Sequence, residues 1–204
     1  MQRRRSVGLA TVAVVLVSDL RHFLDMPDAA PASAKRLGAQ LEAIVRAATA
    51  RPAGRGWTSA VRCIRRPAHR PCVGFVLVLR RAEGEIEWSC ESCGDDGIIR
   101  GWEGSPTDVS SLDDSHAEGE TFALLVTRDV SAVILEVLLL DDACELLVAR
   151  AEGRSDGVLL VGRTDVFAEL LDSVASEANA ETNRRRMQLL DEAYTALDEA
   201  LAIE

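Results

Sequence analysis

The chain has 204 residues, of which 48% are apolar and 27% are charged. This composition supplies enough apolar material for a hydrophobic core and excludes a disordered chain, a collagen-like chain and a coiled-coil rod. The formal net charge is −10, but it is unevenly distributed. Residues 1–81 contain 15 basic and 4 acidic residues, whereas residues 82–204 contain 8 and 29, so the chain joins a basic half to an acidic half.

Two interpretations of this charge layout stay open. Residues 43–82 contain nine arginines and no acidic residue, and such a surface attracts phosphate or an acidic partner. Alternatively, the two halves neutralise each other across an internal interface. Arginine outnumbers lysine 22 to 1, which is typical of a high-GC bacterial genome, so the arginine excess alone does not indicate phosphate binding.

The first 18 residues allow three interpretations. Three arginines precede an apolar run, Val7–Val17, in the order of an export signal, but no small-x-small cleavage site follows. The run is also too short for a membrane span, which needs about 20 residues. The segment is therefore a translated extension ending near Val17 or Ser18, a buried strand or helix, or an export signal. No longer apolar run follows, so we expect a soluble, cytoplasmic protein.

Residues 19–56 are predicted to be mainly helical. A short helical turn over residues 19–26 ends at Pro27, and a longer helix, capped by Ser33, ends before Pro52. Residues 51–56, rich in Pro, Gly and Arg, are predicted to form a linker. The longer helix buries one stripe of apolar side chains at helical spacing, formed by Leu37, Leu41, Ile44, Val45 and Ala48.

The next segment is predicted to form strands. A β-rich run over residues 74–80, a turn at 82–84 and an alternating run over 85–88 together indicate a hairpin. Residues 97–102 offer a third short strand. Residues 103–119 are rich in Ser, Asp, Gly and Pro and show no period, so they are predicted to be a boundary to a second region.

The second region alternates strands and helices. We expect a strand over residues 122–126, then a helix capped by Asp129 and continuing to Leu138. Apolar runs at 146–149 and 158–161 flank a turn-prone segment and indicate a second hairpin. Thr164 is then expected to cap a helix that extends through Ala178.

The last helix carries an apolar stripe at steps of 3, 4, 3 and 4. Such a stripe either packs on its own domain or forms the seam of a homodimer, and both interpretations stay open. The stripe consists of Met187, Leu190, Tyr194, Leu197 and Leu201.

These elements predict an α+β fold. Residues 1–18 are an N-terminal extension or buried strand. Residues 19–112 are expected to form a helix followed by a zinc-ribbon-like β-hairpin domain. Residues 120–204 are expected to form a small acidic α+β interaction domain that ends in two helices.

Four of the five cysteines suggest a metal site. Cys90 and Cys93 form a C-x-x-C pair followed by a glycine, a spacing that directs two sulfurs to one point. A structural Zn²⁺ site needs four N or S ligands. Cys63 and Cys72 supply the second pair, because the hairpin between the pairs returns the chain and brings Cys72 beside Cys90. His69 is an alternative ligand, and four thiolates suit zinc and iron alike.

The arrangement of knuckle, strand, turn, strand and knuckle over residues 57–103 resembles a zinc ribbon. In this chain, however, eight residues separate the first pair of cysteines, where ribbons usually have two, which leaves the ligand at that corner open. Residues 19–25, 44–49 and 93–99, with Trp102, are also similar to an uncharacterised family of high-GC bacterial proteins. That resemblance implies no activity.

No catalytic residue is predicted, and no nucleotide-binding loop or nucleophile elbow occurs. A non-enzymatic role is favoured, although the sequence does not settle whether the protein is an enzyme. The first hypothesis is a structural Zn²⁺ site beside an Arg-rich face that binds nucleic acid or an acidic protein. The alternatives are a protein-interaction module that uses the C-terminal helices and a C-x-x-C thiol redox protein. The candidate binding residues are Arg51, Arg55, Arg65, Arg66, Arg70, Arg80 and Arg81.

Overall fold

The computed structural model describes residues 16–112, 120–137 and 140–202. It confirms the α+β class and the two C-terminal helices. Eight strands form one sheet in the order β1-β5-β4-β3-β2-β7-β8-β6. β1 pairs in parallel with β5, and every other neighbouring pair is antiparallel. Residues 1–15, which carry most of the N-terminal alternatives, lie outside the described residues.

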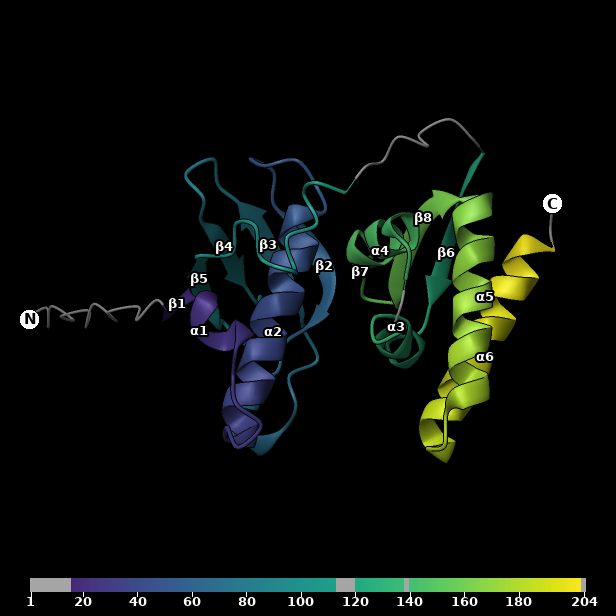
Figure 1. Cartoon of the computed structure of the whole chain (residues 1–204), viewed down its shortest axis with the longest axis horizontal. Coiled ribbons are helices and arrows are strands. Elements are labelled where there is room, and N and C mark those ends of the chain that lie inside the picture. The colour runs from purple at the N-terminus through teal and green to yellow at the C-terminus, as the bar shows by residue number, and fades with distance from the viewer. Residues whose placement is uncertain (1–15, 113–119, 138–139, 203–204) are drawn as a thin grey trace, which may run out of the picture.

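The first half of the chain places one long helix against five strands (Figure 1). A buried apolar cluster that includes Leu41, Ile44, Val76 and Ile99 lies between this helix and the strands. The elements are β1 (Leu16–Asp19), α1 (Arg21–Leu24), α2 (Ala32–Thr49), β2 (Trp57–Arg62), the 3-10 turn η1 (Pro67–His69), β3 (Phe75–Arg80), β4 (Ile86–Ser89) and β5 (Asp96–Arg100).

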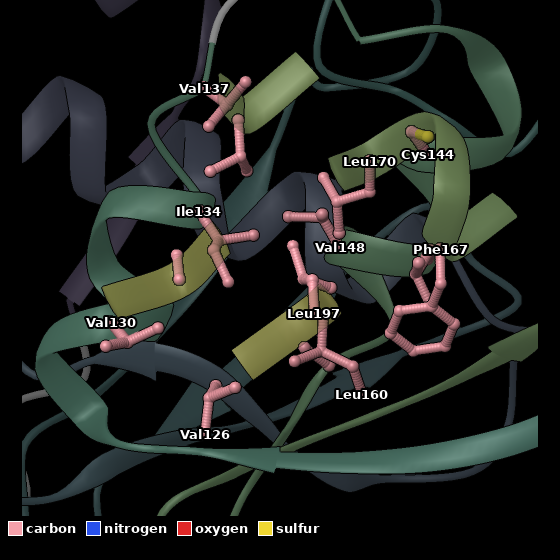
Figure 2. Packing of buried hydrophobic residues seen from close by; sticks show 14 of the residues in the cluster. Val126, Val130, Ile134, Val137, Cys144, Val148, Leu160, Phe167, Leu170 and Leu197 are labelled. Carbon is pink, nitrogen blue, oxygen red and sulfur yellow. The ribbon is translucent and has the colours of Figure 1, made fainter. Parts of the chain in front are cut away.

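The second half packs its helices on the remaining strands, with a second apolar cluster between them (Figure 2). Phe167, Leu170, Leu190 and Leu197 are fully buried there. The elements are β6 (Thr121–Val126), α3 (Arg128–Ile134), α4 (Asp142–Ala149), β7 (Glu152–Gly153), β8 (Val158–Arg163), α5 (Thr164–Ala180) and α6 (Arg184–Leu201).

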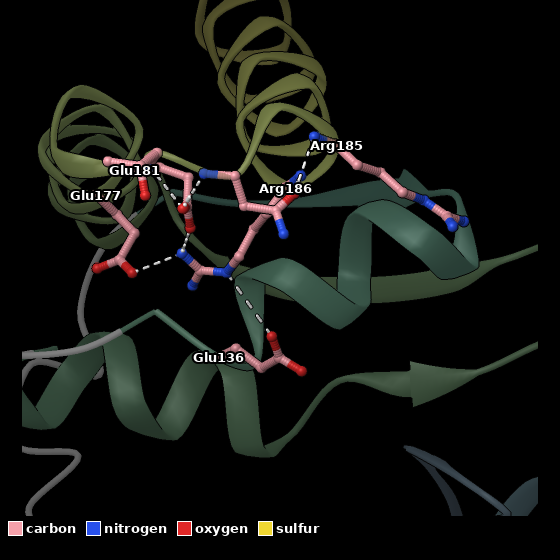
Figure 3. Close-up of polar contacts among 7 residues, drawn as sticks. Glu136, Glu177, Glu181, Arg185 and Arg186 are labelled. Atoms are coloured by element: carbon pink, nitrogen blue, oxygen red, sulfur yellow. Dashed lines mark hydrogen bonds and ion pairs between the residues drawn. The ribbon is translucent and has the colours of Figure 1, made fainter.

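A half-buried arginine, Arg186, fixes the junction between α5 and α6 (Figure 3). Arg186 donates to Glu177 at 2.8 Å and to Glu181 at 2.5 Å, and it lies 3.8 Å from Glu136 of the segment after α3. Asn183 caps α6 by accepting hydrogen bonds from two backbone N–H groups. These contacts hold the two helices antiparallel, so their apolar stripes meet the same cluster.

The predicted strand over residues 146–149 is wrong, because these residues belong to α4. Asp141 caps that helix by accepting a hydrogen bond from the Cys144 backbone N–H at 2.7 Å. α4 is apolar on several sides because it lies between two clusters: Leu146 packs with Ala50 and Val109, whereas Leu147 faces the second-half core. A helix buried on more than one face produces the continuous apolar run that resembles a strand.

Three predicted helix caps are also wrong by one or two residues. α2 begins after Pro31 rather than Ser33, and α5 already includes Thr164. α3 is capped by Thr127, whose hydroxyl accepts from the Val130 N–H, and Asp129 lies in its first turn. That helix ends at Ile134, and Leu138, the expected end, lies outside the described residues.

The two halves are joined through the middle of the sheet. β2 pairs with the two-residue strand β7 at Ser59 and Glu152, and the Ala60 N–H donates to the Ala151 carbonyl at 2.8 Å. The expected boundary segment also contributes, since Val109 is buried and its N–H donates to the Thr49 hydroxyl at 3.1 Å. Residues 113–119 of that segment lie outside the described residues.

The opposite charges of the two halves meet in ion pairs. Arg46 lies 3.3 Å from Glu145, Arg51 lies 2.9 Å from Glu152, and Arg62 lies 3.2 Å from Asp129. Each pair joins the basic first half to the acidic second half. The internal-neutralisation interpretation therefore accounts for part of the charge layout.

Candidate metal centre

Four cysteines from two distant segments meet at one corner of the first-half sheet. Cys63 follows β2, and Cys72 precedes β3. Cys90 and Cys93 lie in the turn between β4 and β5. The hairpin of β3 and β4 places Leu77 opposite Ser89. The segment before β3, which carries Cys72, therefore lies beside the segment after β4, which carries Cys90. The predicted return of the chain is the feature that assembles this corner.

The spacing of the four sulfurs matches a tetrahedral site. The Cys63 and Cys93 sulfurs are 3.6 Å apart, the Cys72 and Cys90 sulfurs are 3.7 Å apart, and all four lie within 4.8 Å of one another. A tetrahedron with metal–sulfur bonds of about 2.3 Å has edges of about 3.8 Å. The four sulfurs could therefore hold one metal ion without a large movement of the chain.

Backbone hydrogen bonds fix the two segments around the sulfurs. The Cys63 N–H donates to the Gly74 carbonyl at 2.9 Å, and the Cys72 N–H donates to the Arg65 carbonyl at 2.8 Å. The Gly94 N–H donates to the Cys90 carbonyl at 2.8 Å, and Gly94 adopts a φ of 73°. A positive φ favours glycine, which explains the glycine after the C-x-x-C pair.

Burial and nearby hydrogen-bond donors shift the pKa values of the cysteine thiols in opposite directions. Burial raises the pKa of Cys63 and the pKa of Cys90 above that of a free thiol. Burial also tends to raise the pKa of Cys72. The Gly74 N–H and the Cys90 thiol donate to its sulfur, however, so the pKa of Cys72 is lowered overall. N–H groups directed at sulfur favour the thiolate, the form that binds metal.

His69, the alternative ligand, does not join the sulfurs. It lies exposed in η1, in the loop between Cys63 and Cys72, and only the four cysteines make up the group of ligand atoms at this corner among the described residues. Both Ala68 and His69 have positive φ values, 49° and 65°.

The seven candidate arginines occupy three different environments. Arg51 stacks on Trp57 at 4.0 Å and donates to the Arg150 carbonyl, while Arg80 donates to the Arg51 carbonyl, so both are tied to internal partners. Arg81 pairs with Glu87, and Arg65 pairs with Asp95. Within residues 16–112, 120–137 and 140–202, three have no ion pair and are exposed: Arg55, Arg66 and Arg70.

A second group of metal-ligand types lies in the other half. Asp141, Cys144 and Glu169 place one ligand atom each within 4.8 Å of one another. Asp141 already caps α4, and the hydrogen bond between its side chain and Glu169 raises the pKa of Glu169. Cys144 is buried and donates to the Val166 carbonyl at 3.4 Å. These internal contacts explain the group.

Sequence reasoning missed other side chains near the cysteine corner. Arg36 and Gln40 of α2, Arg62 at the end of β2 and Trp88 of β4 line a cleft beside Cys63, Cys72 and Cys93. Residues 36 and 40 are four apart on one helix, which places them on one face, but no motif relates them to the cysteines. Only the packing of α2 against the sheet reveals the connection.

Comparison with known proteins gives no further assignment: no family model, no curated protein and no solved structure matches this chain. No helix in the part of the chain that the structure describes has the length and apolar content to cross a membrane.

Proposed function

We propose that this chain is a non-enzymatic metal-binding protein in which Cys63, Cys72, Cys90 and Cys93 hold one structural Zn²⁺. The observation that carries the proposal is the set of sulfur separations, 3.6 and 3.7 Å for the closest pairs, which approach the edge of a tetrahedral zinc site. The zinc-ribbon resemblance over residues 57–103 is part of this proposal.

The structural role follows from the number and burial of the ligands. Four protein ligands complete a tetrahedral zinc site and leave no position for water or substrate, whereas catalytic zinc sites keep one position open. Cys63, Cys72 and Cys90 are buried, which restricts access to the ion. The bound metal would link the loop before β3 to the turn before β5 and stabilise both.

The second part of the proposal assigns the loop between Cys63 and Cys72 to binding. This loop presents Arg65, Arg66 and Arg70 to solvent, and exposed arginines bind phosphate or an acidic partner. The metal anchors both ends of the loop, so it holds these guanidinium groups in place. Affinity for generic single-stranded nucleic acid is expected to fall steeply between low and physiological salt.

The test is elemental analysis of the purified protein with thiol counting before and after chelation. The proposal expects one zinc per chain and four additional reactive thiols after chelation. One iron per chain in place of zinc would support the four-cysteine site and change only the identity of the metal. A protein without metal that also fails to take up Zn²⁺ would contradict the proposal, and absence of nucleic-acid binding at low salt would remove its second part.

A protein-interaction role is the second candidate function. Met187 and Tyr194 of α6 are 37% and 39% exposed, while Leu190 and Leu197 of the same stripe are fully buried. The exposed pair is seven residues apart and lies on one side of the helix. A second copy of the chain could cover this pair, and sedimentation of the parent protein and the double alanine variant would detect such a homodimer.

A further inference from the structure

A cleft lies between α2 and the cysteine corner. Its volume is about 1190 Å³, and it is bounded by α2, the loop that follows Arg62, and the turn that carries Cys93. Arg36 and Gln40 come from α2, and Arg65 and Arg66 come from the loop. We call this space the α2 cleft. One of its walls is the loop whose two ends are Cys63 and Cys72, so its shape depends on the metal corner.

The rim of the α2 cleft is cationic. Arg62 is paired with Asp129 at 3.2 Å and Arg65 with Asp95 at 3.3 Å. Arg36 and Arg66 are exposed and have no ion pair within the residues that the structure describes. Four thiolates around Zn²⁺ would carry a net charge of −2, so together with Asp95 and Asp129 they balance the four arginines, and the unpaired positive charge lies at Arg36 and Arg66. Two guanidinium groups are thus free to bind an anion.

The lining of the cleft contains a polar side chain without a protein partner. Gln40 is only 9% exposed, and its carboxamide forms no hydrogen bond with any residue in the described parts of the chain. The carboxamide is not among the fully buried atoms that lack a partner, so it is open to solvent on the cleft side. A ligand in the cleft would find this donor and acceptor accessible and unpaired.

We propose that the α2 cleft binds a nucleotide, with the phosphate between Arg36 and Arg66 and the base edge against Gln40. Apolar side chains such as Leu16, Leu37 and Ile64 also line the cleft, and an apolar lining suits a base better than a bare inorganic anion. A carboxamide offers both a donor and an acceptor, as a base edge does, whereas the carboxylates of an acidic peptide only accept. The inference rests on the proposed function, because the metal holds the wall that carries Arg66.

The first test compares an arginine of the cleft with one outside it. Arg66 lines the cleft, whereas Arg185 of α6 does not, and both are exposed and unpaired in the described structure. Binding of a labelled six-nucleotide oligo(dT) to the zinc-loaded full chain is measured from low to physiological salt. We expect Arg66→Gln and Arg36→Gln each to lower the slope of log K against log salt by about 0.7, and Arg185→Gln to leave it unchanged. Equal losses from Arg66→Gln and Arg185→Gln would overturn the proposal.

The second test uses Gln40→Leu, which keeps the side chain's size and removes the unpaired carboxamide. We expect a melting temperature equal to or above that of the parent, together with weaker binding and a ratio of oligo(dA) to oligo(dT) affinities that moves towards one. A lower melting temperature with unchanged binding would show that Gln40 is only structural and would overturn the proposal.

Competition identifies the source of the nucleotide. If thymidine monophosphate displaces the oligonucleotide, the cleft takes a free nucleotide; if only the oligonucleotide binds, the ligand is a strand. Both results support the cleft, whereas displacement by polyglutamate with no displacement by nucleotides would overturn it. Zinc content is measured for every variant. A zinc-loaded protein that binds no nucleotide refutes this inference together with the binding role of the loop and leaves the metal site standing, whereas a protein without a metal site refutes the proposed function.

Discussion

Removal of the metal is expected to loosen one corner of the protein and leave the rest folded. An ion bound by Cys63 and Cys93 links two residues that are 30 positions apart. A cross-link that closes a loop of this length lowers the entropy of the unfolded chain and stabilises the fold by about 4 kcal/mol. Because each 1.4 kcal/mol corresponds to a factor of ten, this stabilisation equals about three orders of magnitude in an opening equilibrium.

Hydrogen exchange with mass spectrometry, with and without chelator, measures this effect by segment. The amides of Cys63, Cys72 and Cys90, which donate to Gly74, Arg65 and Asp95 in the structure, should exchange up to about a thousand times faster after chelation. Residues 184–201 serve as the internal control, because α6 packs in the other apolar cluster. Equal acceleration in α6, or none at the three cysteine amides, would refute the reasoning.

Three further predictions concern the fold. Gly153→Ala is expected to destabilise the junction between the halves by about 1–3 kcal/mol, because a Cβ there would lie 2.6 Å from the Ser59 carbonyl oxygen and closer still to the Phe75 ring; an unchanged urea midpoint would contradict this close packing. Leu197→Ala, at a fully buried position, should lower the free energy of unfolding by about 2–5 kcal/mol, whereas Met187→Ala should lower it by about 0.5 kcal/mol or less. Similar losses for the two variants in urea unfolding would contradict the assigned orientation of α6. The Arg21 guanidinium lowers the pKa of Asp19 to about 2 from 3.8, so its contribution to stability is present above pH 3.8 and is lost as the pH falls towards 2; carboxyl NMR should give a midpoint near 2 that returns towards 3.8 in Arg21→Gln, and an unshifted midpoint in the parent would disprove the contact.

The local elements of the first half were largely predictable, because their patterns agree with their environment. The run at residues 74–80 and the alternating run at 85–88 correspond to β3 and β4, which face α2 on one side only. A sheet buried on one face produces alternation. The meeting of Cys72 and Cys90 follows from that hairpin alone.

Other contacts between distant segments were not predictable. β7 has two residues, too few to carry a period, and it exists because β2 offers an edge beside it. Residues 146–149 of α4 resemble a strand because the several buried faces of this helix hide the helical period. The partnerless state of Gln40 is likewise a property of the assembled cleft, since nothing in the residues around it distinguishes it from a solvent-facing glutamine.

The central claim is that four sulfurs surround a single ion, and X-ray absorption spectroscopy at the metal edge of the purified protein tests it most directly. We predict a first shell of four sulfur atoms at about 2.3 Å and no nitrogen or oxygen ligand. The spectrum should be unchanged in Cys144→Ser, since Cys144 lies in the other half of the chain. A shell with fewer sulfurs, or one that includes a histidine nitrogen, would contradict the four-cysteine centre.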